Sequence, residues 1–224
     1  MKIYDVTGKI KNGMWCYGDP FPEYDCTPLV QPEWVKAKVW CEVFGGMNSQ
    51  TGTYLETPAH YLGPEKSYLL EDLPIEKLID VRVSLIKLDP ALFGGKRIAI
   101  TDEMLKEAAK GLDIRPGDAL LFSCGWGGRW FDSSYLAESP YLTYSAVEWL
   151  TEKKPFILGS DIARWDTVPV SQGFWDLFYN SNILMLAPLV GLENVGTKGL
   201  KLTVLPINVA DTSCAPCRAF IKEE

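Results

Sequence analysis

Residues 50–61 have the sequence QTGTYLETPAHY and contain His60, the only histidine of the chain. Side chains of an extended strand alternate between its two faces, so Gln50, Tyr54 and Glu56 are predicted to lie on one face. An amide, a phenol, a carboxylate and an imidazole therefore gather within one short segment. Such a group of polar side chains at the end of a strand indicates a functional site.

The end of this predicted strand follows from its glycine and proline residues. Gly52 lies on the same face and leaves room for a ligand or another backbone segment to approach closely. Pro58 has no N–H to donate to a sheet and holds Thr57 extended, so the strand is predicted to stop there. His60 follows on a turn, from which its imidazole is expected to fold back toward Glu56.

The segment resembles the signature of the cyclase family, the kynurenine-formamidase-like metal-dependent hydrolases, whose pattern is His-x-Gly-Thr-His-x-Asp-x-Pro-x-His. The framework of that pattern is present as Gly52-Thr53, Pro58 and His60. The positions that differ are Gln50 in place of the first histidine, Tyr54 in place of the second, and Glu56 in place of the aspartate. The chain is therefore identified as a divergent member of the family, in which most metal-ligand positions are replaced.

Other segments resemble the same family, so the resemblance extends from Tyr4 to Phe220. They are the turn-rich loop 13–20, the Gly-Trp segment 125–126, the Gly-Ser-Asp segment 159–161 and the closing segment 215–220. The resemblance implies an α/β class with the family's swivelling β/β/α domain, and the length suits one domain over residues 1–224. It also implies a homodimer or a larger homo-oligomer.

Hydrophobic patterning predicts individual elements of this fold. Residues 34–44 alternate apolar and charged side chains, which is typical of a half-buried strand. The apolar run 119–124 predicts a buried strand. Helices are predicted from Thr101, as the N-cap, to about 110 and from 143 to 151.

Composition and charge exclude several classes of protein. Apolar residues make up 47% of the chain, which is enough to bury a core. The net charge of −7 and the lack of a Lys/Arg run argue against a nucleic-acid partner. No apolar window approaches the roughly 20 residues of a membrane span, and the first residues lack a signal-peptide pattern. A cytoplasmic location is expected, with the six cysteines as reduced thiols.

The resemblance also shows which metal ligands are replaced. In the family, a histidine on a helix and a glutamate after the next strand are further ligands, and Trp175 and Ala187 stand at the matching positions. Catalytic zinc sites generally use three protein ligands, frequently histidines, and this chain has one histidine. No cofactor is therefore expected. The alternative is a single divalent ion held by Glu56, His60 and Asp161.

Without a metal, the side chains of the first segment would have to activate water. Imidazole is the only side chain whose unperturbed pKa lies near neutrality, so His60 is the first candidate for a catalytic group. Glu56 is predicted to orient His60, or to act as the base itself if burial raises its pKa. Tyr54 and Gln50 are predicted to donate hydrogen bonds to a carbonyl or an oxyanion.

Further residues are predicted to bind the substrate. By the resemblance, Trp15 lies in a loop that approaches the pocket, and the alternative is that it caps an edge of the core. Asp161 matches the family's Gly-Ile-Asp segment, and the alternative to a substrate contact is that it caps or braces the pocket loop. Arg129 is predicted to bind a carboxylate through two hydrogen bonds, with a packed surface arginine as the equal alternative. Trp175 is expected to fill space or to stack on the substrate.

Three functions on a small-molecule substrate remain open at this stage. The first is hydrolysis of an amide, a cyclic amide or a lactone of a small organic acid by metal-independent acid–base catalysis. The second is a lyase or isomerase reaction, in which Tyr54 or His60 moves a proton and no water is consumed. The third is a catalytically silent protein that binds a ligand.

Overall fold

The structure is a computed structural model that describes residues 1–94, 97–168 and 170–224. Among these residues, eight strands form one sheet in the order β1-β12-β11-β5-β7-β9-β10-β4. Because β4 also pairs with β12, seven of the described strands close into a barrel and β1 flanks β12. The strands are β1 (Lys2–Asp5), β4 (Tyr54–Glu56), β5 (Val81–Lys87), β7 (Ala119–Ser123), β9 (Ile157–Ser160), β10 (Leu184–Ala187), β11 (Leu200–Pro206) and β12 (Cys214–Glu223).

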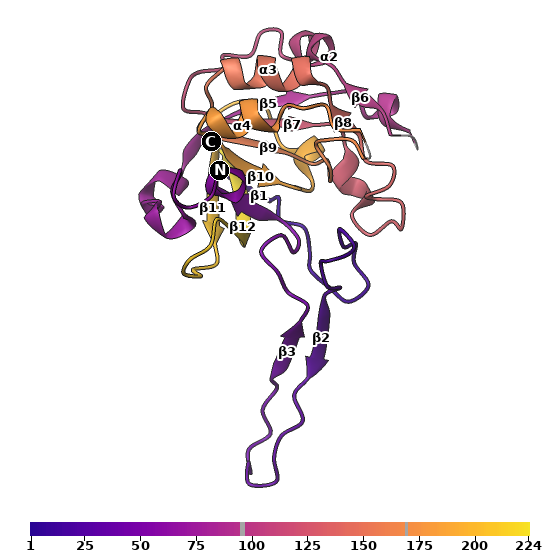
Figure 1. The fold of residues 1–224 in the computed structure, drawn as a ribbon, viewed down its shortest axis with the longest axis vertical. Coiled ribbons are helices and arrows are strands. Elements are labelled where there is room, and N and C mark those ends of the chain that lie inside the picture. The colour runs from indigo at the N-terminus through magenta and orange to yellow at the C-terminus, as the bar shows by residue number, and fades with distance from the viewer. Residues whose placement is uncertain (95–96, 169) are drawn as a thin grey trace.

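Helices cover one side of this barrel (Figure 1). Helix α3 lies between α2 and α4, and contacts both. The α-helices are α1 (Ala59–Leu62), α2 (Asp102–Ala108), α3 (Tyr144–Glu152) and α4 (Trp175–Asn180). The 3-10 helices are η1 (Leu70–Asp72), η2 (Ile75–Leu78), η3 (Pro90–Phe93), η4 (Trp126–Arg129) and η5 (Leu192–Asn194). The remaining strands form two small pairs, β2 (Asp25–Pro28) with β3 (Glu42–Gly45) and β6 (Ala99–Ile100) with β8 (Tyr141–Leu142).

The position of β7 explains its continuous apolar sequence. This strand is parallel to both neighbours, β5 and β9, and every residue in it is buried. Leu120 and Phe122 belong to the core beneath the helices, whereas Leu121 belongs to the core inside the barrel. A strand buried on both faces requires apolar side chains at every position rather than at every second one.

The α/β class predicted from the sequence is confirmed, and so are several of its elements. Thr101 and Thr143 are the N-caps of α2 and α3, and their side chains accept hydrogen bonds from Met104 N–H and Ala146 N–H. Such caps satisfy N–H groups that have no partner in the first turn of a helix. None of the helices in the described part of the chain is long and apolar enough to cross a membrane.

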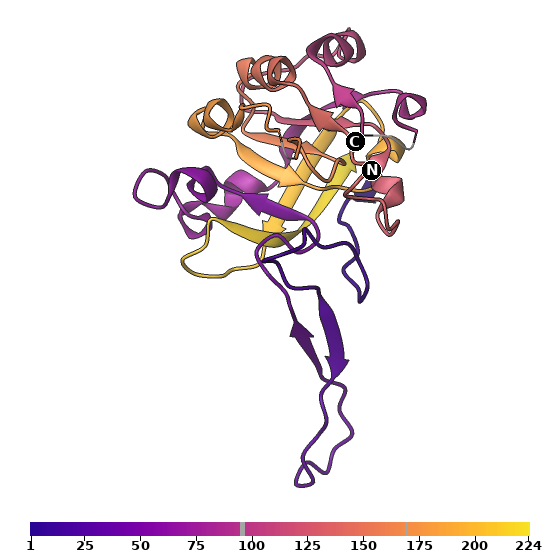
Figure 2. The ribbon, with the colours of Figure 1, turned by 45° about the vertical axis from the view of Figure 1, so that its right-hand side comes forward.

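The prediction of a half-buried strand over residues 34–44 is wrong. Only β3 forms there, and it belongs to a hairpin that projects away from the barrel (Figures 1 and 2). Trp34 is 77% exposed and Trp40 is 89% exposed. The alternation of apolar and charged residues predicted a face that packs on the core, but this segment leaves the body of the chain.

Candidate active site

Residues 50–61 approach one end of the barrel, and the strand within them is shorter than predicted. Strand β4 begins at Tyr54, so Gln50 lies on the turn before it and not on the strand. Gly52 has a φ of +74°, and a Cβ there would lie 2.8 Å from the Ile10 side chain. The Ile10 side chain therefore approaches Gly52 closely, in place of the ligand or backbone segment that the sequence predicts.

Strand β4 is buried because it lies between two other strands. Glu56 is opposite Met185 of β10 on one side and Cys214 of β12 on the other. The strand ends there, and α1 begins after Pro58 and includes His60. The carboxylate of Glu56 is thus fixed by the sheet, while the imidazole follows on a short helix.

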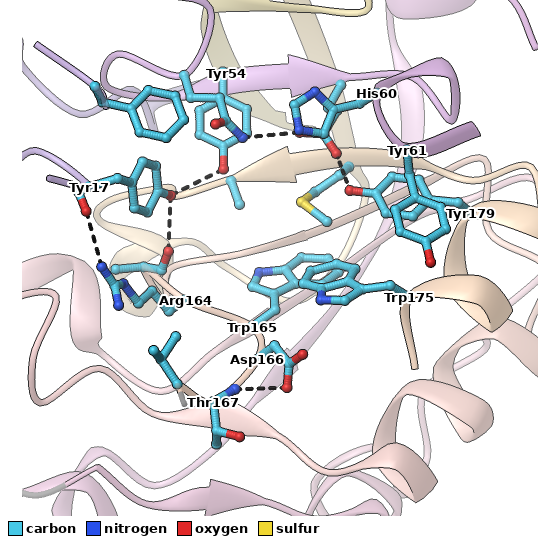
Figure 3. Close-up of a pocket in the computed structure, with 17 residues that line it drawn as sticks. Tyr17, Tyr54, His60, Tyr61, Arg164, Trp165, Asp166, Thr167, Trp175 and Tyr179 are labelled. Carbon is cyan, nitrogen blue, oxygen red and sulfur yellow. Dashed lines mark hydrogen bonds and ion pairs between the residues drawn. The ribbon is translucent and has the colours of Figure 1, made fainter. Parts of the chain in front are cut away.

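A cavity of about 620 Å³ opens beside this strand end. The sequence-predicted residues Gln50, Tyr54, Glu56, His60 and Trp175 all line it. Figure 3 shows the cavity with its side chains. Its other lining residues are Tyr17, Phe21, Tyr61, Ala163, Arg164, Trp165, Asp166, Thr167, Val168, Tyr179, Met185 and Ala187.

Both carboxylate oxygens of Glu56 have partners in the cavity wall. Tyr179 donates a hydrogen bond to Oε1, and Gln50 Nε2 donates one to Oε2 at 3.4 Å. His60 Nε2 lies 3.7 Å from Oε2. Burial raises the pKa of Glu56 above its ordinary value, while His60, Tyr179 and Gln50 act in the opposite direction. The result is a positioned carboxyl group that holds its proton at higher pH than an exposed one.

Tyr54 is the second polar group of the cavity, and its hydroxyl lies 3.1 Å from that of Tyr17. Tyr17 donates its own proton to the carbonyl oxygen of Ala163 at 3.0 Å. Tyr54 must therefore be the donor in the pair of hydroxyls. Burial raises the pKa of Tyr54 well above its ordinary value, so Tyr54 is a neutral hydrogen-bond donor.

Three aromatic rings form a stack along one wall. The Tyr61 and Tyr179 rings are 5.0 Å apart at an angle of 9°, and the Tyr179 and Trp175 rings are 5.6 Å apart at 29°. Tyr61 is 49% exposed at the mouth of the cavity. This wall is suited to contact with a flat, apolar ligand.

Arg164 is the one Lys or Arg residue among the described residues that line the cavity. Its Nη2 donates to the backbone oxygen of Tyr17 at 3.3 Å, and its guanidinium lies 6.0 Å from the centre of the Tyr17 ring. Within the described chain it forms no ion pair. The nearby Asp166 accepts hydrogen bonds from the backbone N–H groups of Thr167 and Gln172, both at 2.7 Å. Arg164 therefore has donors left for an anionic ligand.

Three residues predicted to bind substrate lie outside this cavity. Trp15 packs in an aromatic cluster against Trp130 and Tyr135. Arg129 forms ion pairs with Asp132 and Glu138 at 3.0 and 2.9 Å, and its guanidinium lies over the Trp126 ring. The loop that contains Trp15 does reach the cavity, but through Tyr17 and Phe21 instead.

Asp161 is the third of these residues, and it is completely buried. It accepts hydrogen bonds from Ser123 Oγ at 2.7 Å and from Cys124 N–H at 3.1 Å. Its carboxylate thus joins the ends of β7 and β9 and braces the loop that follows β9. This contact agrees with the predicted brace of the pocket loop, whereas a contact of Asp161 with substrate stays a prediction.

The residues present do not fit the metal site that the fold family implies. No group of three or more His, Cys, Asp or Glu side chains in the described ranges is arranged to hold an ion, which contradicts the alternative set of Glu56, His60 and Asp161. Trp175 and Ala187 line the cavity, and neither side chain has a lone pair to offer a metal. The oxygens of Glu56 already accept hydrogen bonds from side chains.

Sequence reasoning missed Tyr17, Arg164 and Tyr179. One signal was available for Tyr179, because it follows Trp175 by four residues on α4 and such residues share a helix face. Tyr17 and Arg164 lie on loops that are distant in the sequence. The 3.3 Å hydrogen bond from Arg164 Nη2 to Tyr17 O depends on how these loops are arranged in the folded chain.

Comparison with solved structures identifies similar folds. An isatin hydrolase bound to the product analogue thioisatinate has a TM-score of 0.82 and 20% identity, covering 100% of this chain and 93% of that one. Isatin hydrolase A from Ralstonia solanacearum has a TM-score of 0.79 and 19% identity, covering 100% and 92%. A predicted metal-dependent hydrolase from Bacillus stearothermophilus has a TM-score of 0.75 and 22% identity, covering 98% and 97%. At these identities the similarity establishes the fold.

Comparison of sequences gives the family. No curated protein matches the chain significantly. The family model Cyclase, described as "Putative cyclase", matches residues 4–167, which is more than half of the chain. The match includes the segment 50–61 with its glycine, proline and histidine framework. This chain therefore belongs to the Cyclase family.

Proposed function

We propose that this chain is a hydrolase that cleaves an amide, a cyclic amide or a lactone of a small aromatic acid by acid–base catalysis. The observation that supports it most is the convergence of Glu56, His60 and Tyr54 on one cavity of about 620 Å³. A buried carboxyl group, an imidazole and a neutral phenol provide a proton acceptor and a hydrogen-bond donor within reach of one ligand.

His60 acts as the general base in this proposal. It accepts a proton from water while the water oxygen attacks the carbonyl carbon of the substrate. Glu56 Oε2, at 3.7 Å from Nε2, stabilises the imidazolium that forms. The tetrahedral intermediate then collapses, the C–N or C–O bond breaks, and the imidazolium returns the proton to the leaving atom. General acid–base catalysis of this kind contributes about 10²- to 10⁴-fold to rates.

Tyr54 stabilises the oxygen on which negative charge develops. Its hydroxyl donates to Tyr17 without substrate, and it can turn to the substrate oxygen because Tyr17 keeps its own proton on Ala163. The raised pKa of Tyr54 keeps that proton available across the pH range of the reaction. A preoriented donor in a partly enclosed site is more effective than the same donor in water.

The walls of the cavity support an aromatic substrate with an anionic group. The stack of Tyr61, Tyr179 and Trp175 offers a flat apolar surface, and Arg164 offers a cation at the same cavity. A guanidinium binds a carboxylate through two parallel hydrogen bonds. The isatin hydrolases are named for isatin, an aromatic cyclic amide, which supports the same substrate class.

Product analysis in ¹⁸O-labelled water tests the proposal. The purified chain is incubated with isatin, N-formyl arylamines and aryl lactones, with and without a carboxylate, before and after treatment with EDTA. We expect one label in the product carboxylate, turnover that persists after EDTA, and a loss of about a hundredfold or more in His60→Ala. No turnover of any compound, or an unchanged rate in His60→Ala of normal far-UV circular dichroism, would contradict hydrolysis by these groups.

A binding protein without turnover is the second candidate. It is supported by the internal hydrogen bonds of Glu56, because Tyr179 and Gln50 occupy both carboxylate oxygens. Thermal-shift measurements against the same compounds distinguish the two functions. Binding of a compound that is never converted would favour the second candidate, whereas conversion without incorporated label would favour a lyase or an isomerase.

A further inference from the structure

The imidazole of His60 is held less firmly than the carboxylate beside it. Glu56 belongs to a strand and its side chain is 1% exposed, whereas the His60 side chain is 36% exposed. His60 belongs to α1, a helix of four residues whose N-cap, Pro58, makes no side-chain hydrogen bond. Isolated helices of this length are unstable in water. The position of His60 therefore depends on the contacts that attach α1 to the rest of the chain.

The start and the buried side of α1 are attached to the body of the chain. Thr57 N–H, just before the helix, donates to the backbone oxygen of Ser213 at 2.8 Å. Leu62 packs against the core beneath the helices. These contacts fix where α1 begins, and they leave the residue next to His60 to determine how the turn is held at the mouth of the cavity.

Tyr61 is that residue, and it attaches α1 to α4. Its ring stacks on Tyr179, and its hydroxyl donates to Asp176 Oδ1 at 3.0 Å. Asp176 lies in the first turn of α4, and Figure 3 shows Tyr61 and Tyr179 beside His60. The hydrogen bond to Asp176 raises the pKa of Tyr61 above its ordinary value, so the phenol remains a donor at neutral pH. Two contacts from one side chain, a stack and a hydrogen bond, restrict the rotation of α1 against α4.

Tyr179 of the same helix also holds the carboxylate. Its hydroxyl donates to Glu56 Oε1, while its ring supports Tyr61. Glu56 and the residue next to His60 are therefore both fixed to one side chain of α4. This common support sets the separation of His60 Nε2 and Glu56 Oε2, which is 3.7 Å.

We infer that Asp176 is a positioning residue for His60, because it holds Tyr61 and, through Tyr61, the single turn that contains the imidazole. The inference rests on the proposed role of His60 as the general base. Asp176 is exposed and is not among the described residues that line the cavity, so it acts without contact with a ligand. Catalysis by positioned groups is sensitive to such remote contacts, since a displacement of about 1 Å can cost roughly a hundredfold in rate.

Amide hydrogen exchange without substrate tests the attachment of α1. The N–H groups of Leu62 and Gly63 donate to backbone oxygens four residues earlier at 3.0 and 2.9 Å, so their exchange reports opening of this turn. In Asp176→Ala we expect exchange at both to rise about two- to tenfold, the range for loss of one hydrogen bond. Asp176→Asn keeps an oxygen that accepts from Tyr61 and should restore the wild-type rates. Unchanged rates in Asp176→Ala would overturn the inference, and so would an equal rise at the amides of β7, which would show global destabilisation.

Further variants separate this hydrogen bond from the charge of Asp176, since a carboxylate in the first turn also stabilises a helix. Tyr61→Phe removes the donor and keeps both the ring and the carboxylate, so it should raise the exchange of α1 as Asp176→Ala does. The double variant should raise it no further, because both changes remove the same hydrogen bond. Additive effects would assign the role of Asp176 to α4 alone and contradict the inference. Asp102→Ala is the matched control, since Asp102 lies in the first turn of α2 and pairs with Lys106, and it should leave α1 unchanged.

Reaction with diethyl pyrocarbonate follows the imidazole itself. His60 is the only histidine of the chain, so the ultraviolet absorbance of the carbethoxylated ring reports this side chain alone. Without substrate, the reaction should be about two- to tenfold faster in Asp176→Ala than in the wild type, and Asp176→Asn should reverse the effect. An equal rate in Asp176→Ala and the wild type would show that Asp176 does not position His60.

Kinetics with isatin and N-formylaniline connect the position of His60 to turnover. In Asp176→Ala we expect kcat to fall by a factor similar to that for exchange, while KM stays within about twofold of the wild type. A rise in KM with an unchanged kcat would overturn the inference. Turnover of neither compound by the wild type would contradict the proposed function, whereas the exchange and carbethoxylation rates would still decide whether Asp176 holds His60 in place.

Discussion

Tyr179 donates a hydrogen bond to Oε1 of Glu56, although 123 positions separate the two residues in the sequence. The contact joins α4 to the end of β4, and both side chains are buried. Gln50 donates to the other carboxylate oxygen. Glu56 is thus held in one orientation from two sides, which is the condition for a carboxyl group to position His60.

Tyr179→Phe tests this relationship, since it removes the hydroxyl and retains the ring that stacks on Trp175. In this variant the ionised carboxylate of Glu56 loses a hydrogen-bond donor, so the pKa of Glu56 should rise further. A hydrogen bond to a charged group contributes about 1.5–3 kcal/mol, so the free energy of unfolding at pH 7 should fall by that amount. Urea unfolding measures the effect. The matched control is Tyr61→Phe, whose hydroxyl donates to Asp176 at the surface, and equal losses in the two variants would contradict the assignment.

The raised pKa of Glu56 also predicts how stability depends on pH. The folded chain retains the Glu56 proton at a pH where the unfolded chain, with the ordinary value of 4.5, has lost it. The stability from this group is therefore complete below about pH 4.5 and is lost as the pH rises through the folded pKa. Glu56→Gln has no proton to lose there, so its free energy of unfolding should improve relative to the wild type as the pH rises above 4.5.

The free energy of unfolding is measured at each pH. The control must separate the titration of Glu56 from that of the groups around it. The titratable groups that interact with Glu56 are His60, Tyr17, Tyr54, Tyr179 and Cys214. Repeating the comparison in a His60→Gln background removes the imidazole, the one of these groups whose unperturbed pKa lies between pH 5 and 8. A constant difference in the free energy of unfolding between the wild type and the Glu56→Gln variant across this range would show that Glu56 is not perturbed.

The sequence predicts the walls of this site only in part, for physical reasons. The residues of segment 50–61 are close together in the sequence. The two-residue alternation of a strand and the position of Pro58 therefore suffice to predict Tyr54, Glu56 and His60 at a strand end. The family resemblance predicts that Asp161 is a site residue, but its surroundings decide its role, and these come from β7 through Ser123. Side chains from remote loops, such as Arg164, meet the others only after the barrel closes.

The hairpin of β2 and β3 shows the opposite limit of sequence reasoning. Alternation over residues 34–44 predicts a half-buried strand, and this prediction is wrong. A period of two residues indicates which side chains share a face but not whether that face packs on the core, because the period is the same in the body and in a projecting hairpin. Trp34 and Trp40 are 77% and 89% exposed in the folded chain.

Tyr54→Phe tests the proposed stabilisation of the developing oxyanion. The ring remains and the donor is lost, so kcat should fall by about 10²- to 10³-fold, as for removal of a single oxyanion donor. KM should change less, because the hydrogen bond strengthens only as charge develops. Tyr68→Phe is the matched control, since Tyr68 packs against the barrel core away from the cavity. A loss confined to KM in Tyr54→Phe would assign the hydroxyl to ground-state binding.

Arg164→Met tests the predicted preference for anionic substrates. Methionine keeps an apolar stem in the cavity wall but cannot pair with a carboxylate. Because a hydrogen bond to a charged group contributes about 1.5–3 kcal/mol, KM for carboxylated substrates should rise by about tenfold to about a hundredfold. KM for neutral analogues of the same ring should stay within about twofold of the wild type, since hydrophobic contacts with Tyr179 and Trp175 are unchanged.

Arg129→Met is the control, because Arg129 pairs with Asp132 and Glu138 outside the cavity. Equal effects on charged and neutral substrates would place the role of Arg164 in the structure of the loop, through its bond to Tyr17 O, rather than in recognition of an anion.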